Sequence, residues 1–382
     1  MKVIHVIPST RIDASGPTHS VTSLVRALAK TQNDISLASV DIKDNEISKN
    51  PESFEKIFPL GFGPKKLGRS PALYNWLKKE AFDNNTIFHN HGMWQLNALY
   101  CSRVLSESKA KYIQSPRNAL SPYYLNEISL SKSFFWSIFQ RKALQNVDCF
   151  HATCEAEFAA IRNAGFKQPI AIIPNGVEVP EIVNNKRVYE NNIMTYLARL
   201  HPEKGIEEMM KAWQLVQDRF PRWKLQIYGP GSKKYINRLL LLAEELKLKN
   251  IHFLGPVYGD FKYKAYMLSD VYILPSPSEN FGMTIAEALI CGTPVISTKG
   301  SPWQGLAFNN AGWWVDFNIP SIAKAMQDSM SLSSEKRNIM GKRGREWVKK
   351  DFSIDKVSSD YLILYRWLLG EADKIPEFVR FT

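Results

Sequence analysis

Short apolar runs alternate with amphipathic helical patterns along nearly the whole chain, and this alternation restricts the fold more than any other feature. The segment KVIHVI near the N-terminus is predicted to be a strand, and PTHSVTSLVRALAK a helix. Later apolar runs have the length of buried strands with helices between them: TIFH, KYIQ, CFHAT and IAIIP. The pattern predicts an α/β fold with a parallel sheet, in which functional residues follow the carboxyl ends of the strands.

The alternation stops once and then starts again. The segment IPNGVEVPEIVNNKRVYENN contains two prolines, a glycine and several asparagines, so it predicts a linker near residues 176–190. After it come further predicted strands and helices: IMTYLARL, KGIEEMMKAWQLV, WKLQIYG, NIHFLG, VYILP, MTIAEALIC and PVIST. A chain of 382 residues is long enough for two such α/β domains. The last predicted helix, within SIDKVSSDYLILYRWLLGEA, has a pattern that permits packing on either domain.

The net charge of +12 favours anionic partners, such as nucleic acid, an anionic membrane surface or phosphorylated small molecules. No RNA-binding sheet motif is present and the basic and aromatic residues are spread over helices, so nucleic acid is not the expected partner. The first strand is too short for a signal peptide and no apolar run reaches about 18 residues, so we expect a cytoplasmic protein. The four cysteines have neither metal-binding nor redox spacing and are expected to be buried free thiols.

The segment VYILPSPSENFGMTIAEALI places two carboxylates around the start of a helix. VYILP is a predicted strand, and the helix after it is predicted to begin near Phe281–Gly282. The first amides of a helix attract anions, and Gly282 lets a ligand approach the backbone. Glu279 precedes these amides and Glu287 follows inside the helix, where carboxylates can accept hydrogen bonds from sugar or ribose hydroxyls. The alternative is that Glu279 only favours the helix dipole and that Glu287 is solvated; the pairing favours a binding site.

Two cations follow the first strand of the second half. In YLARLHPEKG, Arg199 ends the strand and Lys204 opens the next helix, so both are expected at the carboxyl edge of the sheet, near Glu279. Two cations beside a helix N-terminus are suited to hold a diphosphate. The alternative is that both are surface residues that only increase solubility. The loop IYGPGSKKY adds a glycine-bearing turn at the same edge, a weak signal by itself.

These motifs together resemble the retaining glycosyltransferases of family 4. The second half carries the resemblance in ARLHPEKG, YGPGS, LPSPSENFGMTIAEAL and CGTPVIST, and the first half more loosely in STRIDASGPTHSV, FHNHGMW and IPNGVEV. The resemblance implies the GT-B architecture, two Rossmann-like domains whose parallel sheets face each other across a cleft. Residues 1–180 would form the acceptor-binding domain and residues 188–355 the nucleotide-sugar-binding domain. Residues 356–382 would form a helix that packs back on the N-terminal domain.

The resemblance assigns a role to each matching residue of the second domain. Arg199 and Lys204 would hold the donor diphosphate. Glu279 would bind hydroxyls of the donor sugar, helped by the backbone amides of Phe281 and Gly282.

The remaining roles fall to the nucleoside and to the first domain. Glu287 would bind the ribose, and His91, the second histidine of HNHG, would face the donor sugar. Gly16 would belong to a glycine-rich loop near the phosphates, although this chain has Ser15 where many relatives have another glycine. The implied catalytic residues are Arg199, Lys204, Glu279 and His91, and the implied donor-binding residues are Gly16, Phe281, Gly282 and Glu287.

The implied activity is retaining hexosyl transfer from a UDP- or GDP-sugar to a glycan or lipid-linked oligosaccharide. The implied pathway is bacterial surface polysaccharide assembly, such as O-antigen, capsule or exopolysaccharide. Retention in this family is described as front-face attack, which requires no dedicated nucleophile. The sequence contains no acidic metal-binding cluster, so we expect no metal and no cofactor beyond the donor, with fixed cations stabilising the leaving diphosphate. A nucleotide-sugar epimerase on a related fold is the alternative, and it would act without an acceptor.

Other residues that could carry function receive weaker predictions. His5, His19, His89 and His151 lack ligand spacing and are expected to be structural, and the pair His89 and His91 has no visible third metal ligand. Two residues have open alternatives: Trp94 either lines the acceptor pocket or packs in the core, and Arg117 meets either an acceptor phosphate or the solvent. The segments KSFFWSIFQRKAL and YNWLKKEAF suit peripheral contact with the inner face of the cytoplasmic membrane, or else the edge of the core.

Overall fold

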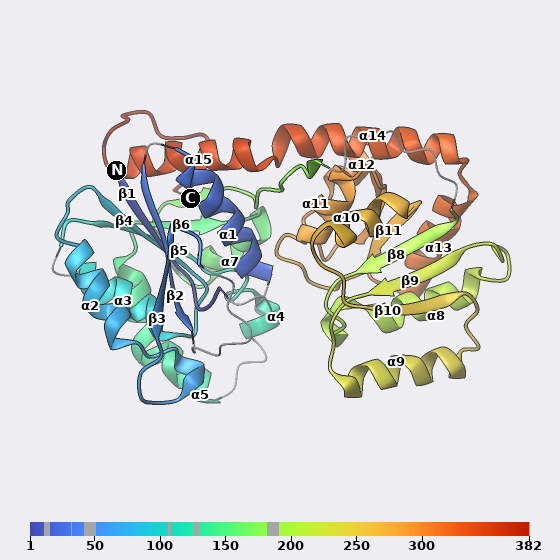
Figure 1. Cartoon of the computed structure of the whole chain (residues 1–382), viewed down its shortest axis with the longest axis horizontal. Coiled ribbons are helices and arrows are strands. Elements are labelled where there is room, and N and C mark those ends of the chain that lie inside the picture. The colour runs from blue at the N-terminus through green and yellow to red at the C-terminus, as the bar shows by residue number, and fades with distance from the viewer. Residues whose placement is uncertain are drawn as a thin grey trace. The chain divides into compact units, whose positions relative to one another are not determined.

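The computed structural model describes residues 1–10, 16–31, 33–41, 51–105, 108–125, 130–181 and 191–381. The chain divides into two compact units (Figure 1): unit 1 contains Met1–Gly176 and Ile354–Thr382, and unit 2 contains Val177–Ser353. Most of the predicted linker, residues 182–190, lies outside the described residues.

Unit 1 is built on an eight-stranded sheet in the order β14-β7-β6-β5-β4-β1-β2-β3. All neighbouring strands are parallel except β14, which pairs antiparallel with β7. Strands β2 and β3 extend the sheet on one side of β1, and strands β4 to β7 extend it on the other side. The strand order therefore reverses between β1 and β4, which creates a topological switch point at their carboxyl ends. The strands are β1 (Lys2–Val6), β2 (Asp34–Asp41), β3 (Glu55–Pro59), β4 (Thr86–His91), β5 (Lys111–Ser115), β6 (Cys149–Ala152), β7 (Ile170–Ile172) and β14 (Val379–Arg380).

Helices cover both faces of this sheet because successive strand residues point to opposite sides. On one face, α1 (Gly16–Ala29) and α15 (Ile354–Leu368) pack together over residues such as Val3 and Ile87 (Figure 1). On the other face, α2 (Pro71–Glu80), α3 (Leu96–Leu105) and α7 (Glu155–Asn163) pack over residues such as Ile4 and Phe88. The remaining helical turns are η1 (Lys65–Leu67), α4 (Pro122–Leu125), α5 (Leu130–Phe135), the π-helical turn η2 (Trp136–Gln140), α6 (Arg141–Ala143) and η3 (Leu144–Asn146).

Unit 2 has a six-stranded parallel sheet in the order β10-β9-β8-β11-β12-β13, with one continuous apolar core. Its switch point lies between β8 and β11. The strands are β8 (Ile193–Leu197), β9 (Lys224–Tyr228), β10 (Ile251–Gly255), β11 (Val271–Leu274), β12 (Val295–Thr298) and β13 (Gly312–Val315). The helices are η5 (Pro202–Lys204), α8 (Ile206–Val216), α9 (Lys233–Glu245), α10 (Gly259–Leu268), α11 (Met283–Ile290), α12 (Gly305–Phe308), α13 (Ile319–Ser331) and α14 (Ser334–Asp351).

The predicted α/β class with parallel sheets is confirmed, while several elements differ from the prediction. Strands β2, β3, β13 and β14 were not predicted, and β4 continues through His91 rather than ending near residue 89. The four cysteines are buried thiols outside any disulfide, as predicted. Among the described residues, no helix has both the length and the apolar character needed to cross a membrane.

Candidate active site

The loops after β8 and β11 form the candidate site in unit 2. These strands are neighbours at the switch point, where α/β sheets bind ligands beyond the carboxyl ends of their strands. The loop after β8 contains Arg199 and leads through η5 to Lys204, and the loop after β11 leads to α11. Gly205 has φ +67°, and a Cβ atom there would lie 2.0 Å from the carbonyl oxygen of Pro275. A glycine at this position lets the two loops touch and brings Lys204 to Glu279.

Lys204 and Glu279 form an ion pair at the centre of this site. The Lys204 ammonium donates to Oε1 of Glu279, and Ser276 Oγ donates to the same oxygen over 3.0 Å. The side chains are only 19% and 11% exposed, so solvent screens their interaction less than at the surface. The hydrogen bonds that described residues donate to this carboxylate all reach Oε1, which leaves Oε2 able to accept from a ligand hydroxyl.

Arg199 is not part of that pair. Its side chain is 60% exposed, and Nη2 lies 3.6 Å from Oε2 of Glu203, four residues further on. The structure therefore brings Lys204 and Glu279 together, as the sequence analysis expected, and leaves the Arg199 guanidinium on the solvent side of the same loop.

The N-terminus of α11 presents unused backbone donors beside Glu279. Gly282 is the N-cap with φ +80°, and α11 begins at Met283, which agrees with the predicted start. Among the described residues, no acceptor takes the amide hydrogens of Phe281 or Gly282. Phe281 is held by Trp303, whose Nε1 donates to its carbonyl and whose ring packs against it. The side-chain oxygen of Asn280 is buried without a partner, and the sequence analysis did not identify it.

Glu287 lies inside α11, and it is buried rather than solvated. Its Oε1 accepts from Lys262 Nζ over 2.7 Å, and its Oε2 accepts from the Tyr266 hydroxyl over 3.1 Å. Both partners lie on α10, four residues apart and therefore on one face of that helix. Burial raises the pKa of Tyr266 well above its usual value, and the Glu287 charge raises it further. The alternative of a solvated Glu287 is wrong; the two α10 partners were missed, although their spacing of four was visible.

The first-unit candidates occupy the switch point between β1 and β4. His91 is the last residue of β4 and is buried; its Nε2 lies 2.9 Å from His5 Nδ1 and its Nδ1 lies 3.1 Å from Arg117 Nη2. Gly16 is the first residue of α1, and Ser15 lies outside the described residues. Trp94 is partly buried and packs against the ring of Trp136.

The group that could hold a metal in the described part of the chain is His5, His89 and His91, whose ligand atoms lie within 4.8 Å of one another. The sequence analysis found no third ligand for the His89 and His91 pair; the parallel register of β1 and β4 supplies one by placing His5 opposite His89. Burial, helped by the Arg117 charge, lowers the pKa of His5 to about 3, and the pKa values of His89 and His91 are also well below the usual range. All three imidazoles are therefore neutral at pH 7.

Comparisons with known proteins agree with this arrangement. Residues 180–347 match the family model of glycosyl transferases group 1, and residues 14–180 match that of Glycosyltransferase Family 4. The D-inositol 3-phosphate glycosyltransferase of Corynebacterium jeikeium is 29% identical over 40% of this chain and 38% of its own length. The enzyme of that name in Corynebacterium urealyticum is 23% identical over 68% of this chain and 66% of its own length. The matched part of the chain thus spans from about two fifths to about two thirds of the length of these relatives.

Solved structures show the same fold over nearly the full chain. Sucrose-phosphate synthase from Thermosynechococcus elongatus superimposes with a TM-score of 0.76 at 21% identity, over 97% of this chain and 100% of that one. HepE from Anabaena, solved with UDP and glucose, gives a TM-score of 0.71 at 15% identity, over 95% and 99% of the two chains. One family model matches each unit, and the solved glycosyltransferase structures share the fold of the whole chain. The chain therefore belongs to the group 1 glycosyltransferases of family 4, which have the GT-B fold.

Proposed function

We propose that the protein transfers a hexose from a UDP- or GDP-sugar to a glycan or lipid-linked acceptor, with retention of configuration. The observation that carries this proposal is the Lys204–Glu279 pair beside unused amides at the N-terminus of α11, at the switch point of unit 2. This arrangement offers positive charge for a diphosphate and a carboxylate for sugar hydroxyls within one site.

The diphosphate would compete with Glu279 for Lys204. Without a ligand, the ammonium is already paired with that carboxylate. A bound diphosphate supplies a second acceptor for the ammonium, and the exposed Arg199 has the freedom to reach the same anion. Negative charge on the leaving diphosphate grows during glycosyl transfer, so both cations would stabilise the transition state more than the ground state. These two cations can perform the role that a divalent ion performs in other transferases.

The donor sugar would bind beside the amides of Phe281 and Gly282. Glu279 Oε2 and the Asn280 side-chain oxygen are acceptors at this position, and sugar hydroxyls can donate to both. Glu287 would accept from the ribose hydroxyls, in exchange for or in addition to its bonds with Lys262 and Tyr266. The acceptor hydroxyl would attack from the face of the leaving group, and the departing phosphate would take the acceptor's proton.

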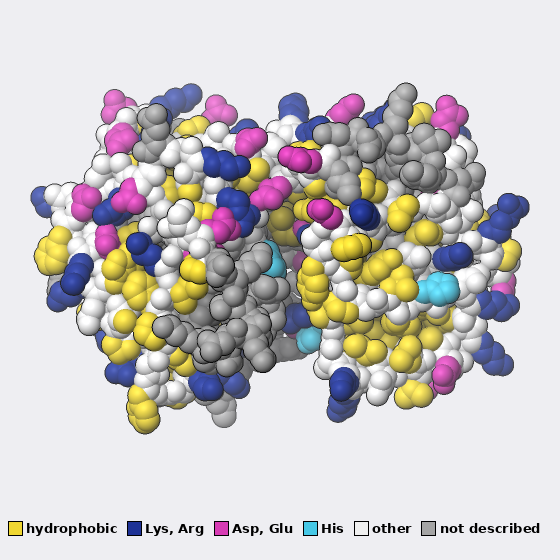
Figure 2. Space-filling model, viewed as in Figure 1, with side chains coloured by type: hydrophobic (Ala, Val, Ile, Leu, Met, Phe, Trp, Pro, Cys, Tyr) yellow, Lys and Arg dark blue, Asp and Glu magenta, His cyan; other side chains and the backbone are white. Residues whose placement is uncertain are grey.

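The acceptor class is proposed from unit 1, whose surface combines aromatic and basic side chains. Phe134, Ile138 and Phe139 are exposed on α5 and η2, and exposed Arg141 and Lys142 follow on α6. Figure 2 shows hydrophobic and basic side chains interspersed on this unit. Such a surface suits an anionic membrane that carries a lipid-linked glycan, as in surface-polysaccharide assembly. Co-sedimentation with phosphatidylglycerol vesicles but not with phosphatidylcholine vesicles would support peripheral binding, and equal partition would exclude this charge-dependent binding.

Thermal-shift screening against UDP, GDP, ADP and their sugars tests the donor assignment. A ligand that binds the folded state raises its stability by mass action, so one base should raise the Tm clearly. Transfer is then followed with the stabilising nucleotide sugar and a mixture of lipid-linked glycans. Stabilisation without transfer but with interconversion of the free sugar nucleotide would identify an epimerase instead. No Tm response to any nucleotide would contradict the proposal.

A further inference from the structure

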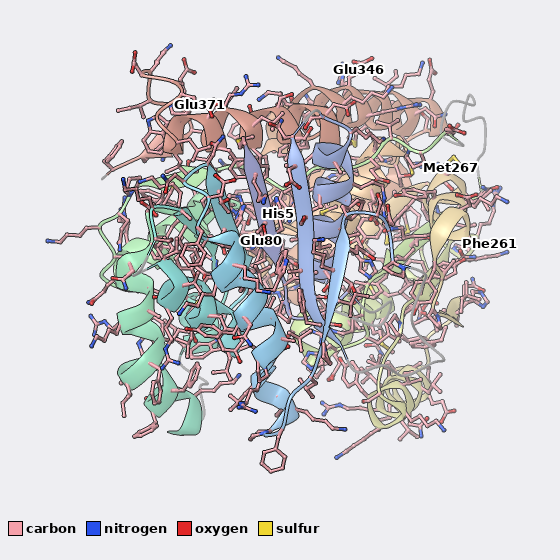
Figure 3. All side chains as sticks on the ribbon, turned by 60° about the vertical axis from the view of Figure 1, so that its left-hand side comes forward. His5, Glu80, Phe261, Met267, Glu346 and Glu371 are labelled. Carbon is pink, nitrogen blue, oxygen red and sulfur yellow. The ribbon has the colours of Figure 1, made fainter. Side chains whose placement is uncertain are left out.

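One face of the unit 1 sheet contains a row of polar side chains at the carboxyl ends of four adjacent strands. The register pairs His5 on β1 with His89 on β4, and His91 on β4 with Ser115 on β5; His151 on β6 follows beyond. Figure 3 labels His5 on its strand in the interior of the unit, where it is 0% exposed. The helix α15 covers this face and adds the hydroxyls of Tyr361 and Tyr365.

The first three members form hydrogen bonds with a fixed direction. Arg117 has only N–H donors, so the contact of 3.1 Å between its Nη2 and His91 Nδ1 makes Nδ1 the acceptor. A neutral imidazole carries one proton, and for His91 that proton is therefore on Nε2, which donates to His5 Nδ1 over 2.9 Å. His5 must then carry its proton on Nε2, which donates to the Tyr365 hydroxyl over 3.2 Å.

The remaining members continue in the same direction. The Tyr365 hydroxyl donates to His89 Nδ1 over 3.0 Å, and His89 Nε2 donates to Ser115 Oγ over 2.7 Å. Ser115 donates to His151 Nδ1 over 2.7 Å, and His151 Nε2 donates to the carbonyl of Ile173 over 2.8 Å. A carbonyl oxygen can only accept a hydrogen bond, so His151 must donate from Nε2. The Ile173 carbonyl therefore imposes the same donor-to-acceptor direction that Arg117 imposes at the other end of the series. We call this series the histidine chain; its members are Arg117, His91, His5, Tyr365, His89, Ser115, His151 and the Ile173 carbonyl.

Arg117 is the half-buried end of the histidine chain. It follows β5, has φ +56° and is next to Asn118 with φ +70°. Buried Glu157 holds this turn by accepting from the Asn118 amide over 2.7 Å. The guanidinium donates to Asn175 Oδ1 over 2.6 Å as well as to His91, and its Nε is buried without a partner. Within the described part of the chain, no carboxylate lies within ion-pair distance of this cation.

We propose that Arg117 is an oxyanion-binding residue of unit 1 and that the histidine chain is the device that orients it. A cation with an unpaired buried donor, at the carboxyl edge of a parallel sheet, is available to a phosphate or carboxylate group. This step rests on the proposed transfer reaction, in which the oxyanion belongs either to the donor diphosphate or to a charged group of the acceptor. The histidines are then positioning residues, because they hold the His91 Nδ1 lone pair toward the guanidinium.

A metal ion fits this cluster less well than the histidine chain does. All six ring nitrogens of His5, His89 and His91 already have hydrogen-bond partners. A divalent ion would have to break several of these bonds and would lie beside the positive charge of Arg117, without any carboxylate ligand to offset it.

Nitrogen NMR of the full-length protein, labelled at histidine, tests the histidine chain without any assay of activity. The expected result is that His5, His89, His91 and His151 are neutral, protonated on Nε2 and unchanged between pH 6 and pH 8. Protonation on Nδ1 of any of these four residues would overturn the directed chain. Equimolar Zn²⁺ is expected to leave their signals unchanged; stoichiometric Zn²⁺ binding that shifts them would replace the proposal with a metal site.

Two variants and a matched control test the role of Arg117. Arg117→Gln should either raise the nucleotide Kd or raise the acceptor KM, in each case roughly tenfold to a hundredfold, the range of a charge-assisted hydrogen bond. A change in the nucleotide Kd would assign the oxyanion to the donor, and a change in the acceptor KM would assign it to the acceptor. Tyr365→Phe removes both hydrogen bonds of this hydroxyl and so interrupts the histidine chain. It should change the same constant about fivefold, the size of one neutral hydrogen bond, because its effect reaches the ligand only through the orientation of Arg117. It should also alter the ring-nitrogen signals of His5 and His89, the two histidines bonded to this hydroxyl.

Tyr112→Phe is the control, because Tyr112 is a fully buried tyrosine of the same sheet whose hydroxyl bonds to Gln114, outside the histidine chain. It should change neither that constant nor the histidine signals. The proposal is overturned if Arg117→Gln changes neither constant, or if Tyr112→Phe has the same effect as Tyr365→Phe. If the protein transfers no sugar at all, the proposed function is refuted. The NMR result would still show whether the histidine chain has the proposed direction.

Discussion

Lowering the pH from 7 to 5 should destabilise unit 1 selectively, because its buried histidines are neutral. Burial is the main cause that lowers the pKa of both His5 and His151 to about 3, from an ordinary value of 6.5, and the charge of Arg117 adds to it. When the folded-state pKa lies below the unfolded one, the unfolded chain binds more protons between the two values. The contribution of these neutral histidines to the free energy of unfolding is therefore fully present above pH 6.5, and it is lost progressively as the pH falls toward 3.

The magnitude follows from the width of that interval. Each pH unit below 6.5 favours the unfolded state by about 1.36 kcal/mol for each such histidine, so pH 5 costs about 2 kcal/mol for each. His5 and His151 together cost about 4 kcal/mol, and His89 and His91 act in the same direction. A domain has a total stability of only about 5–15 kcal/mol, so this is a large loss.

Urea unfolding at pH 7 and pH 5, measured for each unit by pulse proteolysis with peptide mass spectrometry, is the assay. With a urea m-value of about 2 kcal/mol per molar, the midpoint of unit 1 should fall by about 2 M. Unit 2 is an internal control, because the buried histidines of the described residues all lie in unit 1. Equal shifts of the two midpoints, or none for unit 1, would refute the argument that these histidines are neutral.

Three further predictions concern the site in unit 2. Lys204→Ala should lower kcat about 10²–10³-fold, equal to about 2.7–4 kcal/mol for a lost preorganised donor, while an unchanged kcat in steady-state kinetics would place the site elsewhere. Glu287→Ala should raise the donor KM with kcat largely kept if Glu287 binds only the ribose; a fall in kcat at constant KM would assign it to the transition state instead. Transfer should continue in excess EDTA because fixed cations stabilise the diphosphate, and loss that Mg²⁺ or Mn²⁺ restores would show that a metal is required.

The positions of Gly282, Lys204 and Glu279 in unit 2 could be predicted because each follows a strand in a local sequence motif, whereas the Arg199 side chain lies apart from the pair. The helix start at Gly282 and the approach of Lys204 to Glu279 both follow from the order of strand, loop and helix. The partners of Glu287 were not predicted because Lys262 and Tyr266 lie on the preceding helix, and only the packing of α10 on α11 brings them near.

The histidine chain was missed for a different reason. Linear spacing between histidines carries no information when the contacts cross strands. The useful signal is that KVIHVI, TIFHNH and CFHAT each place a histidine late in an apolar run, so that parallel pairing collects them at one edge. The hydroxyls of Tyr361 and Tyr365 reach this edge from a helix more than two hundred residues later, and no local pattern predicts that packing.

Calorimetric titration of UDP and GDP into the full-length protein and two lysine variants tests the central claim most directly. The claim is that Lys204 binds the diphosphate, so Lys204→Ala should weaken binding of the preferred nucleotide roughly tenfold or more. Lys324→Ala is the matched control, since Lys324 is also paired with a carboxylate in unit 2, but its side chain lies on the exposed face of α13; this variant should bind the nucleotide as the wild type does. If neither nucleotide binds the wild type, or if Lys204→Ala binds as tightly as Lys324→Ala, the account of this site is wrong.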